Sequence, residues 1–170
     1  MTPGSRFSII TLTAAAFAAA AVLLLSACHH IDNRRLPFHH ANLMFWTQAD
    51  WEKYGVTGAG EYKIFNKKKL IPANFNYLAS SATGVGGILL VSTYAGEPIA
   101  YDMACPVECN ADIVIFINEE KLAECPRCHS CYDVFMQMGA PVSGDAATEG
   151  YGLEVYTVAP GPGGEYRVIY

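Results

Sequence analysis

The chain has 170 residues, with 11 lysines and arginines against 16 aspartates and glutamates, and a formal net charge of −5. An acidic chain without a stripe of basic residues argues against a nucleic acid as its partner. The length is sufficient for one domain with a substantial hydrophobic core.

The first part of the chain has the layout of a secretory signal. An apolar run follows Arg6 and extends to about residue 25, and small residues precede Cys28. The stretch 25–28, Leu-Ser-Ala-Cys, resembles the signal of a bacterial lipoprotein, in which the cysteine becomes the new N-terminus and carries the lipid. The resemblance implies a signal peptide over 1–27 and lipid attachment at Cys28. A cleaved secretory signal and a transmembrane anchor are the alternatives, although the run is marginal for a membrane-spanning helix.

Residues 28–40 are polar, contain a proline and two His-His pairs, and predict a tether. The protein is then expected in the bacterial cell envelope, outside the cytoplasm, bound to a membrane surface through Cys28 without spanning the membrane. The remaining residues, 41–170, predict one domain.

Short strands at regular spacing dominate the predicted domain. A helical turn is expected at 51–55, where it ends at Gly55. Strands are expected, between turns rich in Gly, Pro and Asn, at 61–65, 88–94, 99–101, 113–117, 121–124, 132–135, 153–158 and 166–170. Because no segment after residue 55 has a sustained helical period, the fold class is predicted as all-β. The aromatic residues Trp46, Trp51 and Tyr54 are expected in the core rather than on a partner surface.

Two cysteine loops carry the candidate chemistry. Cys105 and Cys109 form a Cys-x3-Cys pair, Cys125 and Cys128 form a Cys-x2-Cys pair, and 15 residues separate the pairs. Proline follows the first cysteine of each pair and stiffens the loop. This spacing predicts a four-thiolate metal site. His129 and Cys131 are further donors close by, for a second metal position or a disulfide.

The region from about residue 84 to the C-terminus resembles the Rieske iron–sulfur domain. The residues that carry the resemblance are 96–106, 125–133, 139–144 and 153–156. It implies a stack of small antiparallel sheets with a [2Fe–2S] cluster at a tip formed by the cysteine loops. In that family each loop supplies one cysteine and one histidine. Cys105 and Cys125 match the two cysteine ligands.

The chain departs from the family pattern at both histidine positions. Val107 and Cys128 stand there, and His129 comes one place late. Some members add one cysteine per loop that pair as a disulfide, and Cys109 and Cys131 lie near those places. The resemblance therefore implies a Rieske frame with a thiolate-ligated centre.

A [2Fe–2S] electron-transfer cluster is the expected occupant of the cysteine loops, and a structural four-cysteine Zn²⁺ ion, or no metal with disulfides, is the alternative. A thiol oxidoreductase dithiol is disfavoured, because no helix is predicted after Cys125-x-x-Cys128. No residue set predicts a substrate pocket or a nucleophile with its base. We expect an electron carrier or accessory protein with a redox partner protein, or a non-redox binding module, rather than an enzyme.

Overall fold

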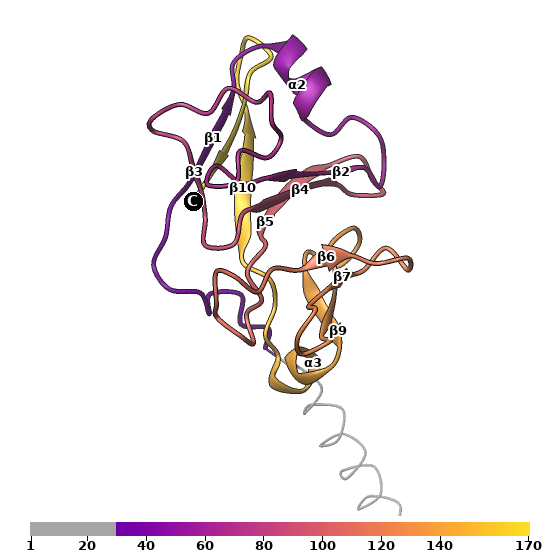
Figure 1. Cartoon of the computed structure of the whole chain (residues 1–170). Helices are drawn as coiled ribbons and strands as arrows, with labels where there is room; N and C mark the ends of the chain where they lie inside the picture. The colour runs from indigo at the N-terminus through magenta and orange to yellow at the C-terminus, as the bar shows by residue number, and fades with distance from the viewer. Residues whose placement is uncertain (1–29) are drawn as a thin grey trace, which may run out of the picture. The chain divides into compact units, whose positions relative to one another are not determined.

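The computed structural model describes residues 30–170, so the predicted signal peptide and Cys28 lie outside the described residues. The described chain consists mainly of β-strands in two antiparallel sheets, with two short helices (Figure 1). This confirms the predicted all-β class. None of the helices within 30–170 has the length and apolar character needed to cross a membrane.

The larger sheet is nearly closed. Its strands are β1 (Ala41–Phe45), β2 (Tyr62–Phe65), β3 (Ala82–Thr83), β4 (Ile88–Ser92), β5 (Pro98–Asp102), β10 (Val155–Pro160) and β11 (Tyr166–Ile169). Their spatial order is β2-β4-β5-β10-β11-β1-β3, and neighbours are antiparallel. Strands that come early and late in the chain thus lie side by side, and β11 pairs with β1.

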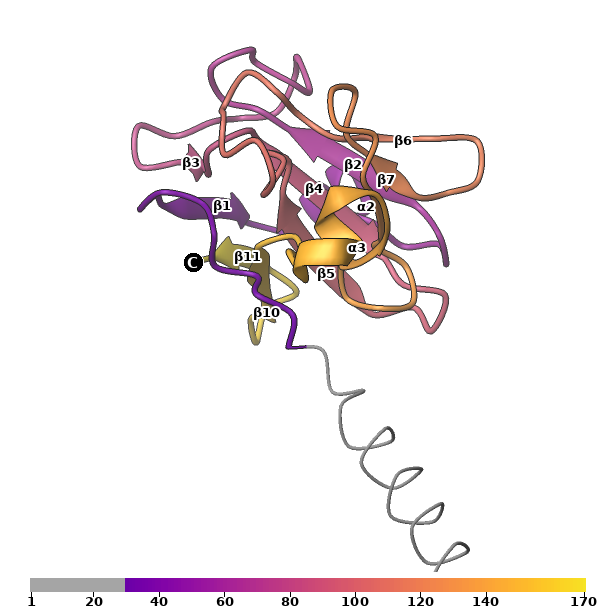
Figure 2. The ribbon, with the colours of Figure 1, turned by 90° about the horizontal axis from the view of Figure 1, so that it is seen from below.

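The smaller sheet lies between the halves of the larger one in sequence. Its strands are β6 (Phe116–Ile117), β7 (Ala123–Glu124), β8 (Cys131–Asp133) and β9 (Ala140–Ser143), paired in chain order. The helix α3 (Asp145–Glu149) follows β9 and lies at the opposite end of the domain from α2 (Gln48–Tyr54) in Figure 1. Seen from below in Figure 2, α3 lies in front of α2.

The strand β4 separates two hydrophobic cores. Its residues are all buried, which matches its unbroken apolar sequence. Because successive side chains of a strand point to opposite faces, Ile88 and Leu90 contribute to one core, while Leu89 and Val91 contribute to the other. The first core contains the aromatic residues around α2, and the second contains Cys105 and Cys125. The cysteine loops are therefore built on a packed core.

The sequence predictions near α2 are largely confirmed. Thr47 and Asp50 form a capping box at the start of the helix, and Gly55 caps its end as expected. Trp51 is buried as predicted, but Trp46 is exposed.

Several elements differ from the sequence predictions: the strands β1, β3 and β9 were not predicted, and β7 is shorter than the strand expected at 121–124. The helix α3 was not predicted, because its five residues are too few to show a helical period. The strand expected at 113–117 is shorter, with only Phe116–Ile117 in β6. Its first half instead joins the chain around Cys105, since Cys105 N donates to Ile113 O at 3.1 Å and Ile115 N donates to Met103 O at 2.8 Å. The segment therefore connects the two sheets.

The segment predicted as a tether lies along the domain from Ile31 onward, and we name residues 31–36 the N-terminal strap. Asp32 forms a parallel bridge with Tyr151, in which Asp32 N donates to Gly150 O at 2.8 Å and Gly152 N donates to Asp32 O at 2.9 Å. Leu36 is buried. The strap thus belongs to the folded unit, which extends from Ile31 to Tyr170.

Candidate metal centre

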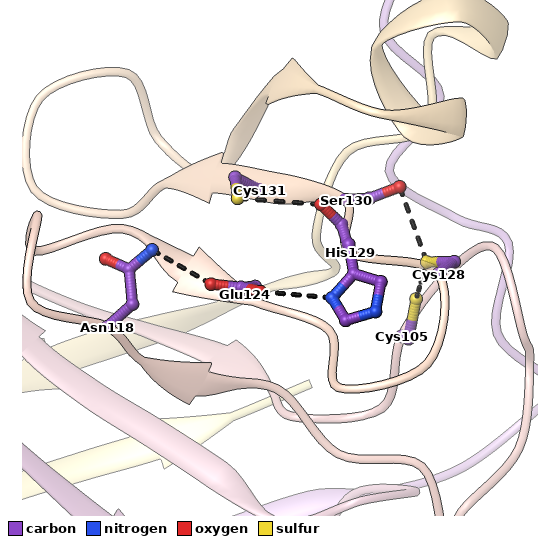
Figure 3. A network of polar contacts seen from close by, with 7 residues as sticks. All are labelled: Cys105, Asn118, Glu124, Cys128, His129, Ser130 and Cys131. Atoms are coloured by element: carbon purple, nitrogen blue, oxygen red, sulfur yellow. Dashed lines mark hydrogen bonds and ion pairs between the residues drawn. The ribbon is translucent and has the colours of Figure 1, made fainter.

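Three cysteine sulfurs converge in the second core, where Cys105 and Cys125 are members and Cys128 packs against it. The Sγ atoms of Cys105, Cys125 and Cys128 all lie within 4.8 Å of one another. Those of Cys105 and Cys128 are 3.7 Å apart, and Figure 3 draws these two side chains. Cys105 and Cys125 are buried, whereas Cys128 is partly exposed. We name this group the thiol triangle. Three nearby thiolates could hold a soft metal ion.

The triangle joins the two sheets. Cys105 lies in the turn after β5 of the larger sheet, whereas Cys125 follows β7 of the smaller sheet and Cys128 lies in the turn before β8. Each turn is closed by a backbone hydrogen bond, with Cys109 N donating to Cys105 O at 2.8 Å and His129 N donating to Cys125 O at 3.0 Å. A metal ion bound here would cross-link the sheets.

Two hydroxyl groups lie beside the sulfurs. Tyr132 Oη is 3.6 Å from Cys105 Sγ, and Ser130 Oγ is 3.4 Å from Cys128 Sγ. Ala146 N, in α3, donates to Ser130 Oγ at 3.1 Å, which fixes this oxygen. The protonated Cys128 thiol donates to Ser130 Oγ, and because a hydroxyl group is also a donor, Ser130 can instead donate its proton to a Cys128 thiolate.

The thiols of the triangle differ in acidity. Burial raises the pKa of Cys105 above its ordinary value, to about 12. Burial also raises the pKa of Cys128, but hydrogen bonds with Ser130 and with the thiols of Cys125 and Cys105 outweigh this effect and hold the pKa below its ordinary value. Cys128 therefore offers a thiolate more readily than Cys105, and a bound cation would favour the loss of the Cys105 proton.

A buried carboxylate holds the chain that leads into the triangle. Asp102, at the end of β5, accepts hydrogen bonds from Val85 N at 2.6 Å, Gly86 N at 2.9 Å and Ala104 N at 2.7 Å, and from the Tyr156 hydroxyl. We name these contacts the Asp102 clamp. A carboxylate with this many donors is satisfied although it is buried. The clamp fixes the position of the backbone one residue before Cys105.

The fourth predicted thiolate lies elsewhere. The Cys109 thiol donates to Pro106 O at 3.1 Å and lies 3.6 Å from Arg35 O in the strap. Cys109 has a φ of 48°, in the left-handed region, and its side chain is exposed. The structure thus brings together three of the four predicted ligands, and Cys109 is not in the triangle.

The two further donors predicted from the sequence also lie outside the triangle. His129 Nδ1 is 3.3 Å from Glu124 Oε1, and the Cys131 thiol donates to His129 O at 3.7 Å (Figure 3). All five cysteines of the described chain are free thiols. Cys28, the predicted lipid attachment site, lies outside the described residues.

Sequence reasoning missed Ser130, Tyr132 and Asp102. A signal for the first two was present, because residues two apart in a strand point to the same face, and Ser130 and Tyr132 bracket the start of β8. Asp102 had no local signal, since its partners Val85 and Tyr156 are far from it in sequence.

No protein family, curated protein or solved structure matches the chain. The resemblance to the Rieske domain therefore stays a prediction based on the residues named above. What the geometry supports directly is a cysteine cluster that could hold a metal ion.

Proposed function

We propose that this protein is a lipid-anchored, extracytoplasmic member of the Rieske-like group that binds a soft metal through Cys105, Cys125 and Cys128. The observation that carries the proposal is the approach of three sulfurs, from two separate loops, to within 4.8 Å of one another. Three thiolates this close to one another would repel, because their charges have the same sign. A bound cation would neutralise that repulsion.

The spacing of the sulfurs favours a single ion. Sulfurs that bind one tetrahedral zinc ion at about 2.3 Å lie about 3.8 Å apart. The 3.7 Å between Cys105 Sγ and Cys128 Sγ agrees with this separation. Zn²⁺ is our first candidate, with the fourth coordination position left to a donor outside the triangle.

The donors do not fit the two-cysteine, two-histidine centre that the Rieske resemblance implies. Val107 has no donor atom, and Cys128 offers sulfur in place of an imidazole nitrogen.

An all-thiolate [2Fe–2S] electron carrier is the second candidate. The hydroxyls of Ser130 and Tyr132 favour it, because hydrogen bonds to cysteine sulfur tune the reduction potential of such clusters. This candidate needs a fourth donor, and the predicted ligand Cys109 would have to rotate toward the triangle.

Metal analysis of single-cysteine variants tests the proposal and separates the candidates. The mature protein, purified under reducing conditions, is expected to be colourless and to contain one equivalent of zinc. Serine at position 105, 125 or 128 should abolish metal binding, while Cys109→Ser and the matched control Cys131→Ser should retain it. Visible charge-transfer bands with equal iron and sulfide, lost in Cys109→Ser, would establish the cluster instead. If the wild type contains no more metal than Cys125→Ser, both the zinc and the iron–sulfur candidates are overturned.

The proposed anchor is tested separately. Cell fractionation should find the wild type in the membrane fraction and the Cys28→Ala variant in the soluble fraction. Mass spectrometry of the N-terminal peptide should show a lipid on Cys28. An unmodified Cys28 in membrane-bound wild type would contradict lipid attachment.

A further inference from the structure

The point at which the folded unit begins limits how far it can lie from a lipid on Cys28. The bridge between Asp32 and Tyr151 fixes the N-terminal strap, and the Arg35 guanidinium lies 3.8 Å from the centre of the Tyr151 ring. Between Cys28 and Ile31 there are only three peptide steps, which span at most about 10 Å when fully extended. If Cys28 carries a lipid, the surface around Ile31 is held against the headgroups.

That surface is apolar. Ile31 and Met138 line one hollow, and Met138 continues into a second hollow with Met136 and Tyr94. The exposed fractions are 42% for Ile31, 64% for Met138, 73% for Met136 and 54% for Tyr94. We name these four residues the methionine face. Large apolar side chains that are exposed next to one another mark an interaction surface.

The turn between β8 and β9 holds the two methionines outward. Phe135 N and Met136 N donate to Asp133 Oδ1 at 3.1 Å and 2.9 Å, and Gly139 N donates to Asp133 O at 2.8 Å. Met138 has a φ of 51°, a left-handed conformation. Their exposure therefore follows from a hydrogen-bonded turn.

The charge of this surface suits a bilayer. Among the residues that line the two hollows, Glu97 is the only one with a charged side chain, and the polar ones, including Asn33 and Gln137, are neutral. Methionine and tyrosine side chains enter the boundary between headgroups and acyl chains at low cost, because they bring apolar area without a full charge.

We propose that the methionine face lies on the lipid bilayer, so that the domain is held against the membrane at this face rather than suspended from a flexible tether. This inference rests on the proposed lipid on Cys28. A bilayer is favoured over a protein partner because the short connection to Cys28 keeps Ile31 at the membrane, and Ile31 and Met138 share a hollow.

Protection from methionine oxidation tests the proposal. Full-length lipidated protein in phosphatidylcholine vesicles is treated with hydrogen peroxide, and sulfoxide formation is followed by peptide mass spectrometry. In vesicles, Met136 and Met138 are expected to oxidise at about one fifth, or less, of their rate in the non-lipidated Cys28→Ala protein, because the bilayer excludes the oxidant. Met44, half-buried on β1, is the internal control and should oxidise at equal rates in both samples.

The outcomes separate this inference from the anchor. Vesicle flotation of the wild type, compared with Cys28→Ala, reports the anchor alone. Flotation with unprotected Met136 and Met138 would overturn the methionine face and leave the anchor standing, whereas no flotation would overturn both. Protection that is equally strong without vesicles would indicate contact between protein molecules and would also overturn the proposal. In the Met136→Ser/Met138→Ser double variant the protein should still float, with Tyr94 more accessible to iodination than in the wild type.

Discussion

The sulfurs of Cys105 and Cys128 lie 3.7 Å apart, yet their surroundings shift the pKa values of the two thiols in opposite directions. Cys105 is enclosed by the second core, and burial raises its pKa to about 12. Cys128 is closer to solvent and has hydrogen-bond partners for its thiolate in Ser130, so its pKa is lowered. A thiol that ionises readily, beside one that resists ionisation, is suited to bind a cation first, before the second thiol loses its proton to the site.

The raised pKa of Cys105 predicts how the stability of the metal-free protein depends on pH. The folded state favours the neutral form of the Cys105 thiol. Its contribution to the free energy of unfolding is therefore complete below pH 9.0, the ordinary pKa of the thiol, and is lost as the pH rises toward the folded-state pKa of about 12. Over this interval the free energy of unfolding of the wild type should fall more steeply than that of Cys105→Ala, by up to about 1.4 kcal/mol per pH unit.

Urea unfolding of both proteins with chelator and a phosphine reductant, at several pH values from 8 to 11, measures this difference. Tyr77 and Tyr101, whose pKa values are raised by causes that do not include Cys105, contribute equally to both proteins and cancel in the comparison. Parallel pH profiles would contradict the assignment.

At the scale of elements, the end of β5 is the part on which the position of Cys105 depends. The Asp102 clamp joins β5 to the turn before β4 and to Tyr156 of β10, so three segments of the chain meet at one carboxylate. Gly84 in that turn has a φ of 67°, and a Cβ atom there would lie 2.1 Å from Asp102 Oδ2. The glycine allows the turn to approach the carboxylate closely.

The Asp102 clamp predicts a large effect of a small change. In Asp102→Asn, one of the two oxygens becomes an amide that donates, and it would face the N–H groups of Val85 or Gly86. We expect a loss of about 2–4 kcal/mol in the free energy of unfolding, since buried hydrogen bonds to a charged group are broken. Metal occupancy should fall as well, because Cys105 is displaced.

Tyr156→Phe is the matched control for that variant. It removes one donor from the clamp and leaves the backbone contacts of Asp102 in place, so a loss of about 1 kcal/mol with normal metal occupancy is expected. Equal effects of the two substitutions in denaturation and metal analysis would show that the backbone contacts do not position Cys105.

At the scale of the whole molecule, the thiol triangle connects the two sheets. Cys105 comes from the larger sheet, and Cys125 and Cys128 come from the smaller one. The smaller sheet has short strands, of two to four residues, and gains little from its own hydrogen bonds. A bound ion would therefore stabilise the smaller sheet more than the larger.

Removal of the metal should thus loosen the molecule unevenly. In hydrogen–deuterium exchange with chelator, we expect residues 116–143 to exchange faster than in the metal-loaded protein, while β4 and β5 change little. The melting temperature should fall at the same time, because a ligand that binds only the folded state raises it. Exchange that is unchanged in the smaller sheet would contradict a metal link between the sheets.

Several elements were predictable because their causes are local. The helix α2 begins at a capping residue and ends at a glycine, β4 is a continuous apolar run, and the turns contain Gly and Pro. The short helix α3 and the reduced length of β6 were not predictable, because neither has a periodic pattern and the chain around Cys105 competes for the residues before β6.

The sequence alone determined the all-β class and pointed to the two loops that hold the candidate site. The alternation of apolar and polar residues, the turn residues and the cysteine spacing are all local features, which involve only a few neighbouring positions. Only the tertiary structure decided which sulfurs meet. Cys109 has the predicted spacing, but its left-handed backbone places its thiol near the carbonyls of Pro106 and Arg35. The direction of a side chain depends on the backbone conformation and on contacts with distant segments such as the strap, and neither is encoded in spacing.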